Sequence, residues 1–216
     1  MGTTFAPGQL SQLGSIINIG VATALPKLAE KYGDPKAVLR ALDGRGQIFA
    51  SHIETALEQA INSMLDLAPI GTTTIALGER HDPDVFYHTR SGLYVWDDFR
   101  ARVVTKAKPS EAGTTFKVDR FELMRDLTDA EIELPLPKNH FFDETVVCAV
   151  IAGLIARQAN GEEGLLMNNG RANLFYTGSY VVRVDWDAGR RLSSVDTYRR
   201  DVIRWRAGLR VFSPAN

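Results

Sequence analysis

Residues 165–198 are LLMNNGRANLFYTGSYVVRVDWDAGRRLSSVDTY, and residues 199–212 continue as RRDVIRWRAGLRVF. Turn sequences divide this stretch at Asn169-Gly170, at 177–179 (Thr-Gly-Ser) and at 187–189 (Asp-Ala-Gly). Asn-Gly is the strongest two-residue hairpin signal, and a glycine at the end of a three-residue loop supplies the positive φ that such a loop needs. The stretch therefore predicts an antiparallel meander of about five strands.

Residues 180–186 show the clearest strand pattern. Tyr180, Val182, Val184 and Trp186 alternate with residues 181, 183 and 185, which are Val, Arg and Asp. This period of two predicts a strand with an apolar face and a polar face. We expect the meander to cover a core with one face and to meet water with the other.

The segment before the meander predicts a buried helix. Asp143 is a suitable N-cap, and the helix should run through Gln158. Its apolar residues cover most of its circumference: Val146, Val147, Cys148, Val150, Ile151, Leu154 and Ile155. A helix that is apolar all round is buried on several sides. We expect it to pack on the apolar face of the meander.

Residues 8–66 have the apolar spacing of helices. The pattern predicts a helix at 10–25, which Pro26 ends or bends, and a short helix from Pro26 to residue 32. Further helices are expected at 35–42 and 48–65. Pro69–Gly71 is the predicted boundary between a helical region, 1–68, and an α+β domain, 69–216, unless the two form one continuous domain.

The middle of the chain predicts mixed structure. Short β-prone runs lie at 72–77, 94–96 and 116–123, and a helix is expected at about 97–106. Thr128 and Glu131 have the capping-box spacing that starts a helix. The predicted fold class is therefore α+β: N-terminal helices, a mixed middle and a C-terminal antiparallel meander packed on a buried helix.

The composition is that of an ordinary globular protein, with 44% apolar and 24% charged residues and a net charge of −1. The single cysteine, Cys148, excludes an intrachain disulfide and a cysteine-rich zinc site. The longest apolar run, Val146–Ala156, is shorter than the roughly 20 residues that span a bilayer. No secretory signal is evident. We predict a soluble, cytoplasmic protein with no cofactor and no membrane partner.

The densest group of metal-ligand residue types is His81, Asp82, Asp84 and His88. Imidazole and carboxylate groups that converge can hold a catalytic metal ion. The His-Asp pair, with His52 upstream, resembles the HD-type phosphohydrolases, although Pro83 places this pair in a loop. The alternative is a polar turn in which the aspartates bend the chain around the proline.

Arginines are concentrated near the C-terminus. Residues 183–216 contain eight arginines and four aspartates, whereas residues 111–163 contain eleven acids and five bases. Arginines interleaved with aromatic residues can grip phosphates and stack on bases. The candidate anion-binding or nucleic-acid-binding residues are Arg190, Arg191, Arg199, Arg200 and Arg206. The alternative is that these arginines keep the strands soluble and pair with the acidic region 111–163.

Three pieces of the C-terminal quarter carry a family resemblance. They are Asn173–Thr177 (NLFYT), Val182–Trp186 (VRVDW) and Trp205–Pro214 (WRAGLRVFSP). The last has the form W-x-A-G-x-R-V-F-S-P and resembles the endings of uncharacterised bacterial proteins that are often met near mobile elements. The resemblance implies a bacterial or phage source and no mechanism.

The sequence contains no coherent set of catalytic residues. The leading functional prediction is a non-catalytic binding or accessory protein of bacterial or mobile-element origin, with an unknown protein or polyanion as its partner. Two alternatives stay open. One is a nucleic-acid or polyanion binder that uses the five arginines, and the other is a metal-dependent hydrolase that uses the 81–88 cluster.

Overall fold

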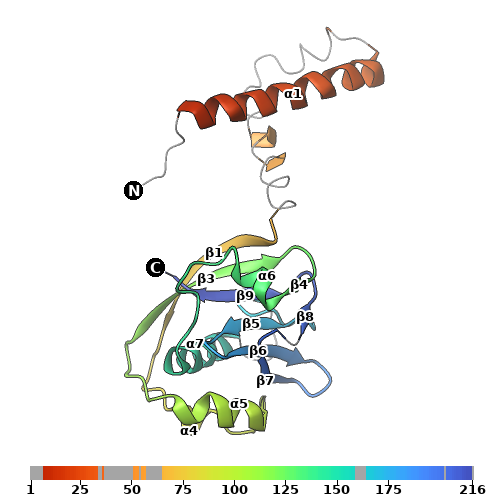
Figure 1. The fold of residues 1–216 in the computed structure, drawn as a ribbon. Helices are drawn as coiled ribbons and strands as arrows, with labels where there is room; N and C mark the ends of the chain where they lie inside the picture. Colours follow the sequence, from red (N-terminus) through yellow and green to blue (C-terminus); the bar gives the residue numbers. More distant parts are fainter. Residues whose placement is uncertain are drawn as a thin grey trace. The chain divides into compact units, whose positions relative to one another are not determined.

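The computed structural model describes residues 7–33, 36, 51–53, 55–56, 65–158, 164–201 and 203–215. The chain forms two compact units, Met1–Gln59 and Ala60–Asn216. The second unit combines helices with a seven-stranded mixed sheet, so the predicted α+β class is confirmed (Figure 1). Pro69–Gly71, the predicted boundary, lies inside the first strand of this sheet.

The described part of the first unit is dominated by one long helix, α1 (Pro7–Tyr32). Of the two predicted effects of Pro26, the end of the helix is wrong, because α1 continues through Pro26, and a bend there stays a prediction. A proline removes only one backbone hydrogen bond, and good helix formers on both sides of it continue the helix. Gly33 has a φ of 73° just after the helix ends, as expected of a C-terminal glycine. The predicted helices at 35–42 and 48–65 lie mostly outside the described residues.

In the second unit the segments predicted as strands at 72–77, 94–96 and 116–123 form β1, β2 and β3. The strands are β1 (Leu67–Ala76), β2 (Leu93–Val95), β3 (Thr115–Leu123), β4 (Leu127–Thr128), β5 (Asn173–Tyr176), β6 (Tyr180–Asp187), β7 (Leu192–Arg199), β8 (Arg204–Trp205) and β9 (Arg210–Pro214). The helices are α4 (Pro83–Phe86), α5 (Asp97–Arg102), the 3-10 turn η1 (Val104–Lys106), α6 (Asp129–Glu133) and α7 (Glu144–Arg157).

The sheet has the strand order β1-β3-β9-β5-β6-β7-β2. Strands β5, β6 and β7 form the expected antiparallel meander. The last strand does not extend this meander: β9 lies on the other side of β5, parallel to it, and pairs antiparallel with β3. Strand β8, which lies between β7 and β9 along the chain, pairs with β4 in a second short sheet. Sequence patterns identify strands but not such distant partners, which tertiary packing decides.

Two of the three predicted turns differ in detail. Asn169-Gly170 does not join two strands, because residues 164–172 lie outside the sheet. The loop between β6 and β7 is one residue longer than predicted, since Asp187 pairs with Leu192. The positive φ of this loop, 54°, is at Arg191 rather than at Gly189. The Asp187 carboxylate accepts a hydrogen bond of 2.9 Å from the Arg190 N–H, which stabilises the longer turn.

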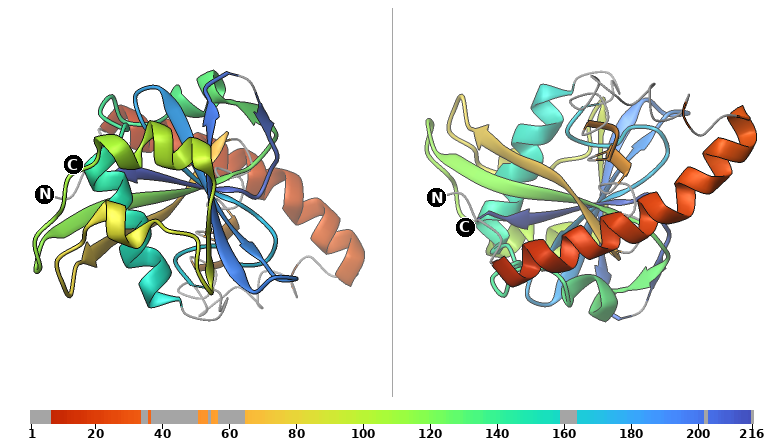
Figure 2. Two further views of the ribbon diagram at one scale, coloured as in Figure 1. Left: turned by 90° about the horizontal axis from the view of Figure 1, so that it is seen from below. Right: turned by 90° about the horizontal axis from the view of Figure 1, so that it is seen from above.

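The expectation that one face of the meander meets water is wrong for its central strands. One core cluster contains Phe175, Val182 and Phe212, and a second contains their neighbours Val181 and Val211. Side chains of successive residues in a strand point to opposite faces. Both faces of the central strands are therefore covered, the first by α7 with α5 and the second by α6 and β8 (Figure 2).

Helix α7 confirms the predicted buried helix. The Asp143 side chain accepts a hydrogen bond of 2.8 Å from the Val146 N–H and so caps its first turn. Cys148 is fully buried in this helix, and burial raises the pKa of its thiol far above the usual value. The thiol is therefore a packing group. Among the described residues no helix has the length and apolar character to cross a bilayer.

Candidate functional site

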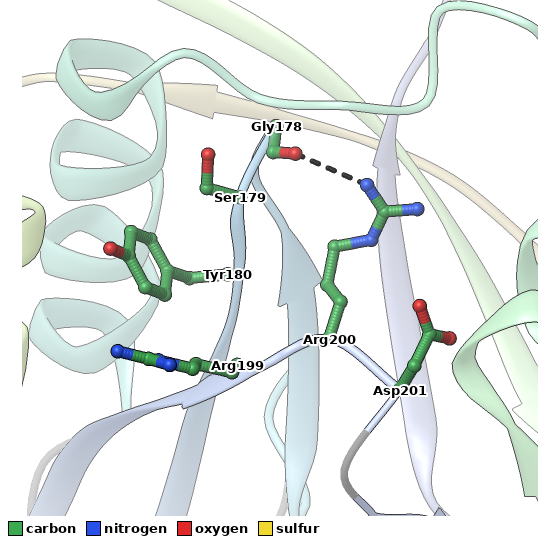
Figure 3. Close-up of a pocket in the computed structure, with 6 residues that line it drawn as sticks. All are labelled: Gly178, Ser179, Tyr180, Arg199, Arg200 and Asp201. Carbon is green, nitrogen blue, oxygen red and sulfur yellow. Dashed lines mark hydrogen bonds between the residues drawn. The ribbon is translucent and has the colours of Figure 1, made fainter.

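The five candidate arginines lie at separate places in the second unit. Arg199, the last residue of β7, and Arg200, just after it, line a pocket of about 390 Å³, which we call the Arg199 pocket (Figure 3). Arg190 and Arg191 lie in the turn at the opposite end of the β6–β7 ribbon. Because β6 has eight residues, this turn is roughly 25 Å away. Arg206 follows β8. These residues do not form one patch, and polyanion binding through them stays a prediction.

Arg200 has a structural role in this pocket. Its guanidinium group forms an ion pair with Glu133 and donates a hydrogen bond of 3.1 Å to the Gly178 carbonyl (Figure 3). It also lies over the Phe141 ring, 4.9 Å from the centroid. Arg204 pairs similarly with Glu131, at 3.5 Å. The predicted alternative, pairing between the basic tail and the acidic region, is therefore present at these two arginines.

Below the pocket lies a carboxylate that sequence reasoning missed. Asp129 is fully buried, and it accepts hydrogen bonds from Tyr176 Oη at 2.7 Å, from Trp205 Nε1 at 2.6 Å and from the Asp201 N–H at 2.6 Å. Burial first, and then the neighbouring Asp129 charge, raises the pKa of Tyr176 far above its usual value. Asp201 has a φ of 63°, which directs its N–H to Asp129. This group joins four segments of the unit, and its donors leave no open site for a ligand on the carboxylate.

The four candidate metal ligands do not converge on one point, and two of them, Asp82 and His88, have other hydrogen-bond partners. Asp82 caps α4 by accepting a hydrogen bond of 3.1 Å from the Asp84 N–H, as the alternative interpretation predicts. His88 Nδ1 lies 3.2 Å from Arg100. His81 packs edge-on against Phe86. Within the described ranges no three His, Cys, Asp or Glu side chains come close enough to hold a metal ion. The metal-dependent hydrolase stays a prediction.

His81 nevertheless lines a pocket of about 630 Å³, which we call the His81 pocket. It lies between the end of β1, helix α4 and the C-terminal half of α7. Most of its surface is apolar, contributed by Ala76, Leu77, Val85, Phe86, Ala152, Gly153 and Ala156. An apolar concavity of this volume with a few polar groups is the usual form of a small-molecule site.

The imidazole of His81 is buried in the wall of this pocket. Backbone hydrogen bonds with Ser110 in both directions, of 2.9 and 2.8 Å, fix its position. Its ring lies edge-on to Phe86 and Tyr87, with centroids 5.3 and 5.9 Å away. Its Nε2 has no hydrogen-bond partner among the described residues. Burial lowers the pKa of His81, an effect that the Asp82 carboxylate opposes, so the ring is neutral near pH 7.

Two arginines at the rim of the His81 pocket carry unpaired charge. Arg90 donates a hydrogen bond of 2.6 Å to the Phe86 carbonyl, and its guanidinium group lies 4.7 Å from the Phe86 ring centroid. Arg157 donates a hydrogen bond of 3.0 Å to the Thr74 carbonyl. In the part of the chain that the structure describes, neither guanidinium group pairs with a carboxylate. Each guanidinium group is held in place by a backbone carbonyl, and its other N–H groups can bind an anion.

A third rim arginine differs. Arg80 lies 3.5 Å from Asp82 and 3.8 Å from Glu111, so its charge is neutralised within the protein. The His81 pocket thus combines an apolar floor, two unpaired guanidinium groups and a neutral imidazole. It is the strongest candidate site in the second unit. Sequence reasoning singled out His81 but not Arg90 or Arg157, because only the fold brings them to the same pocket.

Comparisons with known proteins add no assignment. The chain matches no protein-family model, no curated protein and no solved structure.

Proposed function

We propose that the unit Ala60–Asn216 is a binding module for a small organic anion, and that the ligand is an aromatic or branched carboxylate bound in the His81 pocket. The observation that carries this proposal is that Arg90 and Arg157, both anchored by backbone carbonyls and neither paired with an acid among the described residues, line one apolar pocket. Guanidinium groups bind carboxylates through two parallel hydrogen bonds.

The apolar floor supports a ligand with a hydrocarbon body. Val85 is 71% exposed at the pocket, beside the half-buried Phe86. An apolar body placed on these side chains removes their surface from water, which contributes about 25 cal/mol per Å². The neutral imidazole of His81 adds a group that can donate or accept one hydrogen bond. This proposal keeps the leading prediction of a binding protein and adds a ligand class to it.

The experiment is a calorimetric titration of the full chain with benzoate. Arg157→Met and Arg90→Met should each weaken binding about tenfold or more, because a hydrogen bond to a charged group contributes about 1.5–3 kcal/mol. Arg80→Met is the matched control, since Arg80 lines the same pocket with its charge neutralised. Its affinity should stay within about twofold of the wild type.

Benzamide, which keeps the ring and removes the charge, should bind at least about tenfold more weakly than benzoate. The proposal fails if the wild-type chain shows no saturable benzoate binding. It also fails if benzamide binds as well as benzoate, or if Arg80→Met weakens binding as much as Arg157→Met.

A further inference from the structure

A second concavity lies where β2 ends. Strand β2 pairs in parallel with Ser193–Val195 of β7, and the Trp96 N–H donates to the Val195 carbonyl at 3.0 Å as the chain leaves the sheet. Strand β7 continues to Arg199. The outer edge of residues 196–199 therefore borders a pocket of about 590 Å³, which we call the Trp96 notch. It shares no residue with the His81 pocket.

Two aromatic rings form one wall of the Trp96 notch. Tyr94 and Trp96 are perpendicular, at 88°, with centroids 5.2 Å apart. Trp96 is 47% exposed, yet its Nε1 donates a hydrogen bond of 3.1 Å to Ser194 Oγ. The indole is therefore held in one orientation with half of its surface open. Fixed aromatic faces of this kind attract cations through the negative charge density of the ring.

The charges of the notch are separated by the strand. Ser194, Asp196 and Tyr198 point to one side of β7, and Thr197 and Arg199 point to the other. The hydrogen bond to Ser194 places the Trp96 indole on the same side as Asp196. Arg199 pairs across the ribbon with Tyr180, and the two side chains lie together in Figure 3. Arg183, the cross-strand partner of Asp196, lies on the aromatic side as well, where it pairs with Asp185 at 3.3 Å. That side therefore carries Asp196 next to an arginine that already has an acidic partner, and Arg199 lies on the opposite side.

One arginine on the basic side of the notch, Arg102, is neutralised. Arg102 lies 5.3 Å from the Tyr180 ring centroid and pairs with Asp98 at 2.9 Å. Asp97 forms no ion pair within the described ranges. A cation on the aromatic side would thus meet the Asp196 carboxylate beside Arg183, an arginine that already pairs with Asp185 at 3.3 Å.

Thr197 faces away from the aromatic side of the notch, into the first core cluster. Thr197 is 3% exposed, and its hydroxyl group has no hydrogen-bond partner among the described residues. Buried hydroxyl groups in native proteins nearly always have such a partner. The Asp196 carboxylate is occupied with the Thr197 N–H, at 2.7 Å, and not with the hydroxyl group. The hydroxyl group has no accessible surface and points to the face of β7 opposite Asp196, so a ligand in the notch does not reach it.

We propose that the Trp96 notch binds an organic ammonium ion, with its head between the Tyr94 and Trp96 rings and the Asp196 carboxylate. The shared chemistry of the ligand is an alkylated ammonium, which a choline-type small molecule or a lysine side chain of a partner protein can supply. This site is separate from the proposed organic-anion site, so that either can fail without the other.

The test follows the indole N–H signal of Trp96 in nitrogen-labelled full-length protein, assigned by loss of the signal in Trp96→Phe. Choline and tetramethylammonium should shift this signal in a saturable way. The neutral isostere of choline, 3,3-dimethylbutan-1-ol, should bind at least about tenfold more weakly, because it lacks the charge that the rings and Asp196 recognise. Nα-acetyl-lysine amide forms the second arm, and the tighter of the two cations identifies the source.

Variants locate the contacts. Asp196→Asn keeps the hydrogen bond to the Thr197 N–H and should weaken choline binding about fivefold or more. Asp84→Asn, an exposed carboxylate on α4, is the matched control and should leave it unchanged. Equal binding of choline and its neutral isostere, or an Asp196→Asn variant with wild-type affinity, overturns the proposal, as does the absence of a shift with every cation.

Discussion

The indole Nε1 of Trp205 donates a hydrogen bond of 2.6 Å to Asp129 Oδ1, joining residues that are 76 positions apart in the chain. The pair connects the first turn of α6 to the short strand β8. Tyr176 donates to the same oxygen from β5. One buried carboxylate thus joins α6, β8 and β5 around the second core cluster. No local sequence pattern predicts this contact.

Asp129→Ala should be strongly destabilising. It removes the acceptor of three buried or half-buried donors, and we expect a loss of about 3–5 kcal/mol, since unpaired buried polar groups cost about 1–3 kcal/mol each. Urea denaturation of the full chain measures this loss. Asp126→Ala removes a single hydrogen bond to the Ala207 N–H at the exposed surface and should cost less than about 1 kcal/mol. Comparable losses for the two variants would contradict the central role of Asp129.

Arg199, which ends β7, and Arg200, which follows it, should differ sharply in their effect on stability. Arg200→Met leaves the Glu133 carboxylate, whose side chain is 14% exposed, without its ion-pair partner, and should cost about 2–3 kcal/mol. Arg199→Met should change the free energy of unfolding by less than about 0.5 kcal/mol, because Arg199 is exposed and forms no ion pair in the described part of the chain. Chemical denaturation of both variants, under the same conditions, measures the two changes in the free energy of unfolding. Equal effects would mean that Arg200 is not structural.

The sequence predicted the elements that short-range chemistry determines. The Asp143 cap and the Thr128–Glu131 capping box were identified because each needs only residues three apart, and both are present. The strand at 180–186 was identified because alternation is a local pattern. The same patterns could not predict that β9 pairs in parallel with β5, because strand partners are decided by the packing of distant segments.

The candidate sites show the same limit. The five arginines form one group in the sequence, but β6 and β7 carry Arg190 and Arg199 to opposite ends of the ribbon. Conversely, Arg90 and Arg157 are far apart in the chain and line one pocket. Side chains that meet across a fold can be recognised only when the register of the strands and the position of α7 are known.

Gly153→Ala should destabilise the second unit although alanine favours helices. A Cβ atom at position 153 would lie 2.5 Å from Ile75 Cγ2, so α7 and β1 would have to separate. The cost of such overpacking, about 1–3 kcal/mol, exceeds the gain in helix propensity of about 1 kcal/mol. Gly178→Ala is the control, because no described heavy atom comes within 4 Å of an added Cβ there. Thermal denaturation of the two variants measures the difference, and a stabilised Gly153→Ala would show that the close approach is not rigid.

Stability should fall as the solution becomes more acidic, in part because of His81. Burial lowers the pKa of His81 in the folded chain below its ordinary value of 6.5. The unfolded chain therefore takes up a proton near pH 6.5 that the folded chain resists. The contribution is complete above this pH and is lost as the pH falls through and below it. His81→Phe should remove this part of the pH dependence of the unfolding free energy.

The measurement is a series of urea denaturations of the wild type and of His81→Phe between about pH 5 and about pH 7. The stability difference between the two should shift in favour of the phenylalanine variant as the pH decreases. Gly178→Ala, which changes no titratable group, is the control, and its unfolding free energy should follow the pH dependence of the wild-type curve. If His81→Phe also follows that curve, the imidazole titrates alike in the folded and unfolded chains. The wall of the His81 pocket would then not be apolar enough to favour the neutral imidazole. The neutral His81 ring could then no longer be assigned to the organic-anion site.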